Sequence, residues 1–195
     1  MSYLSEEDFA EILDTVEVLP ISSKKLSNLT QYFFDVGIAK EYETFIMNDA
    51  LRLDALGISK TFVMIHRKTN ELIGYFTLSA DTVKLVNEEK EGTDLKVVPF
   101  MTLPALKVGK LAINKALSET ARRKGYGSFA LELANTHAYE VLESGVACRF
   151  LTVDADIEYY PDTPIFYEKN GFKYNQSKKR RASDRTISMR RDIFA

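Results

Sequence analysis

Hydrophobic and polar positions along the chain switch between helical spacing and short apolar runs, a pattern typical of an α/β protein. One apolar stripe at helical spacing follows Ser5, and a broader one begins at Glu41 and stops before Gly57. Helices are expected from Ser5, at 27–36, 41–56 and 127–144, and in a segment that starts near Pro161 or Pro164 and ends at Gly171. Strands are expected at 16–21, 61–66, 72–79, 107–113, 147–155, 172–175 and 186–193.

The strands at 61–66 and 72–79 are predicted to form a hairpin, because their spacer is short and contains the turn-former Asn70. Gly74 inside the second of them indicates a bulge or a close backbone approach. The charged stretch 81–103 then breaks the pattern. It has two interpretations, a surface excursion or a flap over a substrate cleft, and the first is favoured because few long loops are functional.

The stretch 106–128 has the strongest functional signal. A strand closes at Leu111-Ala112-Ile113, a polar connection covers 114–121, and Arg122-Arg123-Lys124-Gly125-Tyr126-Gly127 opens a long helix. Glycines allow a close backbone approach, and the first N–H groups of a helix are unpaired and carry the positive end of its dipole. This turn, with three cations, is therefore predicted to bind a pyrophosphate.

Composition bounds the class of protein. The 195 residues suffice for one domain, 1–195, with 45% apolar and 28% charged residues. Residues 1–103 carry 10 Lys and Arg against 17 Asp and Glu, whereas 104–195 carry 16 against 11, so an anionic ligand would be drawn to the second half unless the imbalance is chance. The acidic N-terminus is no secretory signal, and no apolar run approaches membrane-spanning length, so we expect a cytoplasmic protein without membrane contact.

Several kinds of site find no support in the sequence. Cys148 is the only cysteine and lies in an apolar strand pattern, so we expect a buried, inert thiol. His66 and His137 lack the spacing of metal ligands, and His137 is predicted to be a core residue. No nucleophile elbow or Walker motif is present. The basic run Lys178–Arg181 has two interpretations: it binds RNA phosphates, or it forms a solvated turn. The net negative charge of the protein favours the solvated turn.

Two motifs together resemble the GNAT superfamily of N-acetyltransferases. The pattern Q/R-x-x-G-x-G/A is met by Arg122, Gly125 and Gly127, and the later pattern of a helix ending in Gly-Phe is met from Phe166-Tyr167 to Gly171-Phe172. Thr163 stands where the family usually has Ala. The resemblance covers about 16–193 and implies a twisted, mixed, mostly antiparallel sheet of about six to seven strands with helices on both faces.

The resemblance also implies a chemistry, which is the transfer of acetyl from acetyl-CoA, with no metal, to a primary amine. Tyr167 would protonate the departing thiolate, and Asp154, Asp156 and Glu158 are candidate bases, with helix capping, solvation or a water base as alternatives. The implied cofactor-binding residues are Leu111, Ala112, Ile113, Arg122, Arg123, Lys124, Gly125, Tyr126, Gly127 and Ser128.

A closer resemblance is to the branch that includes antitoxin-paired toxins that acetylate aminoacyl-tRNA. It rests on Gly74–Ser79, Leu103-Pro104-Ala105, Gly109–Ile113 and Val153-Asp154-Ala155. The implied partners are a small-molecule, peptide or aminoacyl-tRNA acceptor, an antitoxin, and a second copy in a homodimer. A non-catalytic acyl-CoA-binding interaction protein is the alternative from another class.

Overall fold

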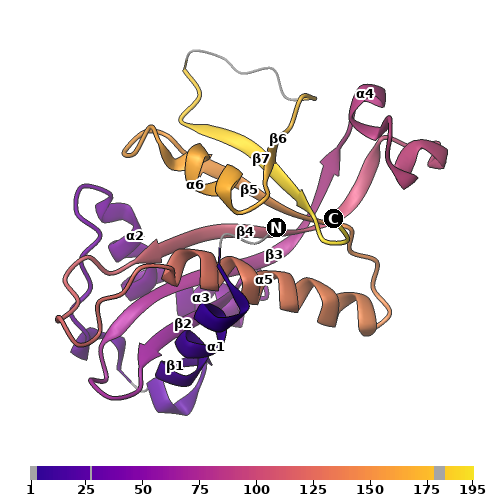
Figure 1. The fold of residues 1–195 in the computed structure, drawn as a ribbon. Coiled ribbons are helices and arrows are strands. Elements are labelled where there is room, and N and C mark those ends of the chain that lie inside the picture. The colour runs from indigo at the N-terminus through magenta and orange to yellow at the C-terminus, as the bar shows by residue number, and fades with distance from the viewer. Residues whose placement is uncertain (1–3, 27, 178–182) are drawn as a thin grey trace. The chain divides into compact units, whose positions relative to one another are not determined.

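The computed structural model describes residues 4–26, 28–177 and 183–195. It contains a seven-stranded sheet in the order β1-β2-β3-β4-β5-β7-β6 (Figure 1). The strands are β1 Val16–Pro20, β2 Lys60–His66, β3 Leu72–Lys84, β4 Thr102–Ile113, β5 Phe150–Asp156, β6 Lys173–Tyr174 and β7 Thr186–Asp192. The pairs β1–β2, β2–β3, β5–β7 and β6–β7 are antiparallel. The predicted α/β class and strand number are confirmed.

Helices occupy most of the predicted places. They are α1 Glu6–Thr15, α2 Lys40–Thr44, α3 Ala50–Ala55, α4 Asn87–Lys90, α5 Tyr126–Glu143 and α6 Thr163–Lys169, with a π-helical segment at Phe45–Asp49 and 3-10 turns at Lys24–Leu26, Leu29–Gln31 and Asp94–Val97. Ser5 caps α1 by accepting a hydrogen bond from the Asp8 N–H at 3.0 Å, as its sequence predicts. Among the described helices, none is long and apolar enough to cross a membrane.

The chain forms two compact units. The N-terminal unit comprises Leu4–Ser79 and Val108–Leu133, and the C-terminal unit comprises Ala80–Lys107 and the described part of Ala134–Ala195. Strands β3 and β4 and helix α5 contribute residues to both. The expectation of a single domain stays a prediction. The basic run 178–181 lies outside the described residues.

The hairpin of the N-terminal unit has both features that Gly74 suggests. The β2–β3 register shifts after the pair Met64↔Gly74, which is a bulge-type irregularity. A Cβ atom on Gly74 would lie 2.4 Å from the backbone oxygen of Ala112, so β3 and β4 approach each other closely here. The hairpin turn contains Asn70 at φ 55°, a conformation that Asn tolerates better than most residues.

One predicted helix is wrong. In the described part of the segment predicted at 27–36, residues 28–36, the only helical element is the 3-10 turn Leu29–Gln31, which Asn28 caps by accepting from the Thr30 N–H at 3.0 Å. The helix predicted at 41–56 is present, but the π segment shifts its faces, so Ile46, Ala50 and Asp54 are buried while Leu51 is 55% exposed.

In the C-terminal unit, the segment that leaves the sheet is shorter than the predicted excursion 81–103. Strand β3 continues to Lys84 and β4 already begins at Thr102, so only the residues between them leave the sheet. The Glu89 carboxylate of α4 lies 2.7 Å from the guanidinium of Arg190 on β7, and these side chains are 2% and 9% exposed. This buried ion pair joins the excursion to the sheet, which supports a fixed surface element rather than a flap.

Candidate functional site

The turn before α5 leaves backbone donors unused. The first backbone hydrogen bond of the helix joins the Phe129 N–H to the Gly125 oxygen at 2.8 Å. Within the described part of the chain, the N–H groups of Tyr126, Gly127 and Ser128 have no recorded acceptor, as expected at a helix N-terminus. These three donors lie at the positive end of the helix dipole, which is what the predicted pyrophosphate site requires; the site itself stays a prediction.

Gly125 is required here for a reason that the sequence does not reveal. Its φ is +99°, and a Cβ atom would lie 3.0 Å from Leu4 Cδ1 and 3.4 Å from Ile12 Cδ1. Leu4, just before α1, and Ile12, within α1, therefore pack against this turn. The glycine allows that packing as well as the left-handed backbone conformation.

The three cations before the helix have different surroundings. Arg122 donates through Nη2 to the Leu117 oxygen at 2.8 Å, so its side chain folds back on the preceding connection. Arg123 is paired with Asp8 at 3.0 Å and Glu11 of α1 at 3.2 Å.

Lys124 is exposed, and no ion pair or hydrogen bond of its side chain is recorded with the described residues. Tyr126 is buried and donates its hydroxyl hydrogen to the Ala121 oxygen at 2.7 Å, while Ser128 is 1% exposed. Tyr126 and Ser128 therefore hold the turn, and Lys124 is the cation best placed to meet an external anion.

Strand β4 ends at Leu111-Ala112-Ile113, the segment predicted to pair with the cofactor. In the sheet order β4 lies between β3 and β5. Backbone groups that a strand leaves unpaired can pair with the amides of an extended ligand, so the pairing of this segment with a cofactor stays a prediction.

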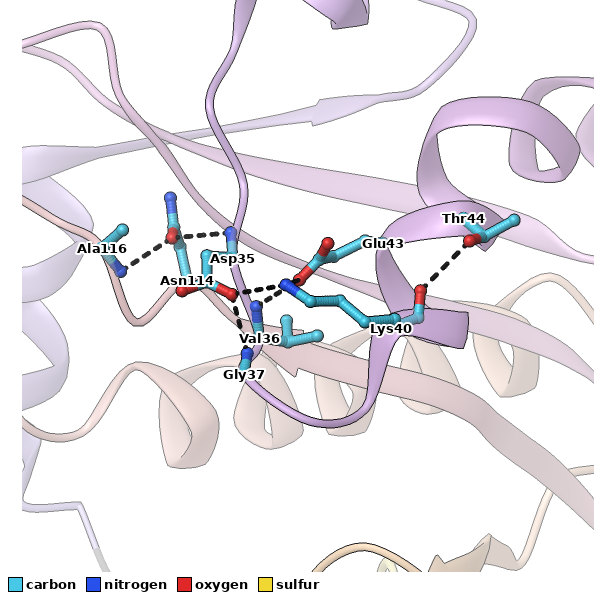
Figure 2. Close-up of polar contacts among 8 residues, drawn as sticks. All are labelled: Asp35, Val36, Gly37, Lys40, Glu43, Thr44, Asn114 and Ala116. Atoms are coloured by element: carbon cyan, nitrogen blue, oxygen red, sulfur yellow. Dashed lines mark hydrogen bonds and ion pairs between the residues drawn. The ribbon is translucent and has the colours of Figure 1, made fainter.

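Asn114 fixes this end of the strand (Figure 2). Its Nδ2 donates to the oxygens of Phe33 and Leu72, both at 2.9 Å, and its Oδ1 accepts from the N–H groups of Asp35 at 3.2 Å and Ala116 at 3.0 Å. The amide thereby uses its two donors and two acceptor positions, and the side chain is buried. One residue joins β4, the start of β3 and the loop at 33–35.

The same loop is held from its other side (Figure 2). The Val36 N–H donates to Glu43 Oε1 at 2.8 Å, and Lys40 lies 2.9 Å from Asp35 and 2.8 Å from Glu43. The hydrogen bond from Lys40 lowers the pKa of the Asp35 carboxyl, with help from the backbone N–H of Gly37. The loop is therefore a fixed part of the unit. Neither it nor Asn114 was singled out by the sequence pattern.

Lys110 of β4 lies over aromatic rings. Its Nζ is 4.4 Å from the ring centroid of Tyr42 and 5.4 Å from that of Phe45, and 3.4 Å from the carboxylate of Glu41. The hydroxyl of Tyr75 donates to the Tyr42 oxygen at 2.8 Å. These contacts fix helix α2 beside the strand predicted to bind the cofactor, through cation–π attraction and packing.

Tyr167 is buried in the C-terminal unit. Its side chain is 8% exposed, and its ring makes edge contacts with Phe166 and Phe172. Burial raises the pKa of its phenol, and the nearby carboxylate of Asp156 raises it further. The hydroxyl is therefore protonated throughout the physiological range, and the raised pKa makes it a weaker acid than a solvent-exposed tyrosine. Its predicted role as general acid stays a prediction.

The candidate bases are engaged in other contacts. Asp154 lies 2.6 Å from Lys107, Asp156 accepts from the Glu158 N–H at 2.9 Å, and Glu158 lies 3.4 Å from Arg185. None of them is at the N-cap of α6, which is Asp162, so the capping alternative is wrong.

The remaining candidates for metal or thiol chemistry are accounted for. His137 is only half-buried, with Nδ1 2.6 Å from Glu140, so the prediction of a core histidine is wrong. Cys148 is buried, as predicted, and burial raises the pKa of its thiol. In the described ranges, no group of three or more His, Cys, Asp or Glu residues is placed to hold a metal ion.

Comparison with known proteins gives the fold. No family model matches the chain. A solved structure of a tyrosine-to-phenylalanine mutant of KacT is 19% identical with a TM-score of 0.67, covering 89% of this chain and 94% of that one. AtaT complexed with acetyl-methionyl-tRNAfMet is 17% identical with a TM-score of 0.65 and coverages of 89% and 93%. An AtaT mutant toxin bound to acetyl-CoA and the C-terminus of the antitoxin AtaR is 17% identical with a TM-score of 0.64 and coverages of 93% and 95%. The chain shares the GNAT fold of these toxins, as the sequence motifs predict.

Proposed function

We propose that this protein is an acetyl-CoA-dependent N-acetyltransferase whose acceptor is the α-amine of an aminoacyl-tRNA. The observation that carries the proposal is the fold likeness over about nine-tenths of the chain to AtaT, whose solved structures contain acetyl-CoA or an acetylated aminoacyl-tRNA. The unused amides at the start of α5 support it independently, because they fit the phosphates of a nucleotide cofactor. By the same likeness, we propose an antitoxin as a protein partner.

The residues around the turn fit acetyl-CoA, which supplies an acetyl group activated as a thioester. The N–H groups of Tyr126, Gly127 and Ser128 would hold its pyrophosphate, with the exposed Lys124 as the nearest cation without a recorded partner among the described residues. The backbone of Leu111–Ile113 would pair with the pantetheine amides.

Tyr167 would act as the general acid. Acetyl transfer to an amine forms a C–N bond and breaks a C–S bond, so the leaving thiolate needs a proton and the amine must lose one. A buried phenol keeps its proton until it is needed, and the Tyr167 hydroxyl would donate that proton to the sulfur. The amine proton would leave to water or to a carboxylate of β5.

The test separates cofactor binding from turnover. Tyr167→Phe should lower kcat by about 10²-fold or more, the range for general acids, with little change in acetyl-CoA affinity measured by calorimetry. Tyr139→Phe is the matched control, since its hydroxyl donates to the Ile193 oxygen in the same unit. An unaltered rate in Tyr167→Phe would remove the tyrosine from its role.

A second pair of variants tests the anion position. Lys124→Ala should weaken acetyl-CoA binding several-fold, and more so at low ionic strength, whereas Lys68→Ala on the hairpin turn should not. Binding of acetyl-CoA without acetylation of any amine, peptide or charged tRNA would instead support the non-catalytic interaction protein.

Expression in bacteria adds a cellular readout. Growth arrest that is relieved by Tyr167→Phe is expected if charged tRNA is the acceptor. Arrest that persists in this variant would contradict the proposal.

A further inference from the structure

Helix α6 ends in a Schellman motif that includes Tyr167. The Phe172 N–H donates to the Tyr167 oxygen at 3.0 Å, and the Gly171 N–H donates to the Glu168 oxygen at 3.0 Å, which are the two hydrogen bonds of this motif. Gly171 has a φ of +80°, the left-handed conformation that the motif requires. The rings of Tyr167 and Phe172 lie 5.4 Å apart in an edge contact. The position of the Tyr167 ring therefore depends on how the helix ends.

Arg191 of β7 contacts this helix end at three points. Its Nη1 donates to the Asn170 oxygen at 3.2 Å, and its guanidinium carbon lies 5.7 Å from the ring centroid of Phe172. A Cβ atom on Gly171 would lie 3.3 Å from the Arg191 Cδ, so the aliphatic part of the arginine covers the glycine. A cation that binds a carbonyl at the C-terminus of a helix is also favoured by the helix dipole.

Both partners of the hydrogen bond between Arg191 and Asn170 are held by other contacts. Asn170 is 1% exposed, and its Nδ2 donates to the Phe166 oxygen at 2.8 Å, one turn earlier in α6. Arg191 is paired with the buried Leu151 across β5 and β7. An isolated helix shorter than about 12 residues is marginal in water, so α6, with seven residues, depends on such contacts with its surroundings.

These contacts act on the position of Tyr167. Arg191 contacts Phe172, which in turn contacts Tyr167, and the two aromatic side chains are buried. The pKa of the Tyr167 phenol is raised by burial first and by the Asp156 carboxylate second. Arg191 therefore has a route to Tyr167 through packing and through the backbone of the helix end.

We propose that Arg191 is a positioning residue for Tyr167, because it fixes the Schellman end of α6 to the sheet of the C-terminal unit and so holds the phenol in one place. The inference rests on the proposed function for the role of Tyr167 as the acid. A general acid must lie within hydrogen-bond reach of the atom that it protonates, and a misplacement of about 1 Å can cost about 10²-fold in rate.

The first experiment measures kcat for acetylation of pooled charged tRNA and acetyl-CoA affinity by calorimetry. Arg191→Met keeps much of the aliphatic chain and removes the guanidinium, and it should lower kcat by about 10-fold with unchanged acetyl-CoA affinity. Arg191→Lys keeps a donor and should restore part of the rate. Lys173→Met is the matched control, since it removes an exposed cation from the neighbouring strand β6 and should change neither value.

A double-mutant cycle tests whether Arg191 acts through Tyr167. In the Tyr167→Phe background the ring remains but the proton donor is absent, so adding Arg191→Met should lower kcat no further. Losses that multiply in the double variant would overturn the inference, because they would assign Arg191 an effect independent of Tyr167. Phe172→Leu breaks the same route at another point, and it replaces Arg191→Met in the cycle if that variant does not fold.

A readout that does not need activity is the hydrogen exchange of the Gly171 and Phe172 amides. Arg191→Met should speed their exchange several-fold, because these amides make the two hydrogen bonds of the helix end. Tyr139→Phe, which removes a hydrogen bond to the Ile193 oxygen in the same unit, should not.

The outcomes separate the two proposals. Unchanged exchange at Gly171 and Phe172 in an active enzyme would overturn the inference and leave the proposed function intact. No acetylation of any amine, peptide or charged tRNA by the natural protein would overturn the proposed function, and with it the catalytic part of the inference.

Discussion

Replacing Asn114 by alanine tests how the end of strand β4 is fixed. The substitution removes four hydrogen bonds, of which the one to the Leu72 oxygen is buried and the other three are partly buried. Water can replace some of the partly buried partners, while a buried carbonyl left unpaired costs about 1–3 kcal/mol. With about 0.5 kcal/mol for each of the other three bonds, we expect Asn114→Ala to lower the free energy of unfolding by about 2.5–4.5 kcal/mol.

The assay is urea denaturation followed by circular dichroism, with acetyl-CoA affinity measured on the folded protein. Asn28→Ala is the control, because this exposed asparagine only caps a short 3-10 turn, and its loss should cost about 1 kcal/mol or less. Under the proposed function, Asn114→Ala should also weaken acetyl-CoA binding, since the side chain joins β4 to its surroundings directly after Ile113. A loss of stability no larger than that of Asn28→Ala would refute the reasoning.

Asn114→Asp tests the two hydrogen bonds that the Asn114 side chain donates separately from the two that it accepts. The new carboxylate keeps both acceptor bonds but faces the oxygens of Phe33 and Leu72, so the folded state raises its pKa above the unfolded value of about 3.9. The variant should therefore be destabilised at pH 7 and should recover relative to the natural protein as pH falls through the raised pKa. Equal stability of the two proteins at pH 7 would contradict the assigned donors.

Three further changes have defined outcomes. Gly74→Ala should displace β4, because its Cβ would lie 2.4 Å from the Ala112 oxygen, and calorimetry should show weaker acetyl-CoA binding; unchanged affinity would argue against the cofactor strand. Gly125→Ala should lower the free energy of unfolding by about 1–3 kcal/mol, because alanine is strained at a φ of +99°. A thermal melt measures this loss, and a smaller loss would mean that the backbone of the turn changes its conformation. Hydrogen bonds from Ser118 lower the pKa of Glu71, so their contribution to stability is present above about pH 4.3 and lost as pH falls through the lowered value. Glu71→Gln should flatten that part of the pH–stability curve, and an unchanged curve would assign the acid sensitivity elsewhere.

Much of the fold was predictable because its signals are local. Ser5 caps α1, Pro164 lies in the first turn of α6, and Gly145 and Gly171 follow helices with φ of +92° and +80°. Each signal acts within one turn of backbone, so the sequence alone shows it.

The errors arise where distant contacts decide the conformation. The segment 27–36 has apolar residues at helical spacing, but Asn114, about 80 residues away, binds the backbone of Phe33 and Asp35 instead. The hydrogen bond between Thr152 and Asp81 was also invisible in the sequence, because these residues come together only in the folded chain. The turn at Gly125 was found, but its packing against α1 was not, since Leu4 and Ile12 are remote in sequence.

The burial of Cys148 has a practical consequence. It is the protein's one cysteine, it is 4% exposed, and its thiol pKa is raised, so thiolate-directed reagents should react with the native protein slowly. A colorimetric reagent for free coenzyme A can then follow acyl transfer continuously with little background from the protein itself. The same inertness allows a fluorescent label to be attached at any newly introduced surface cysteine while the natural one is left in place.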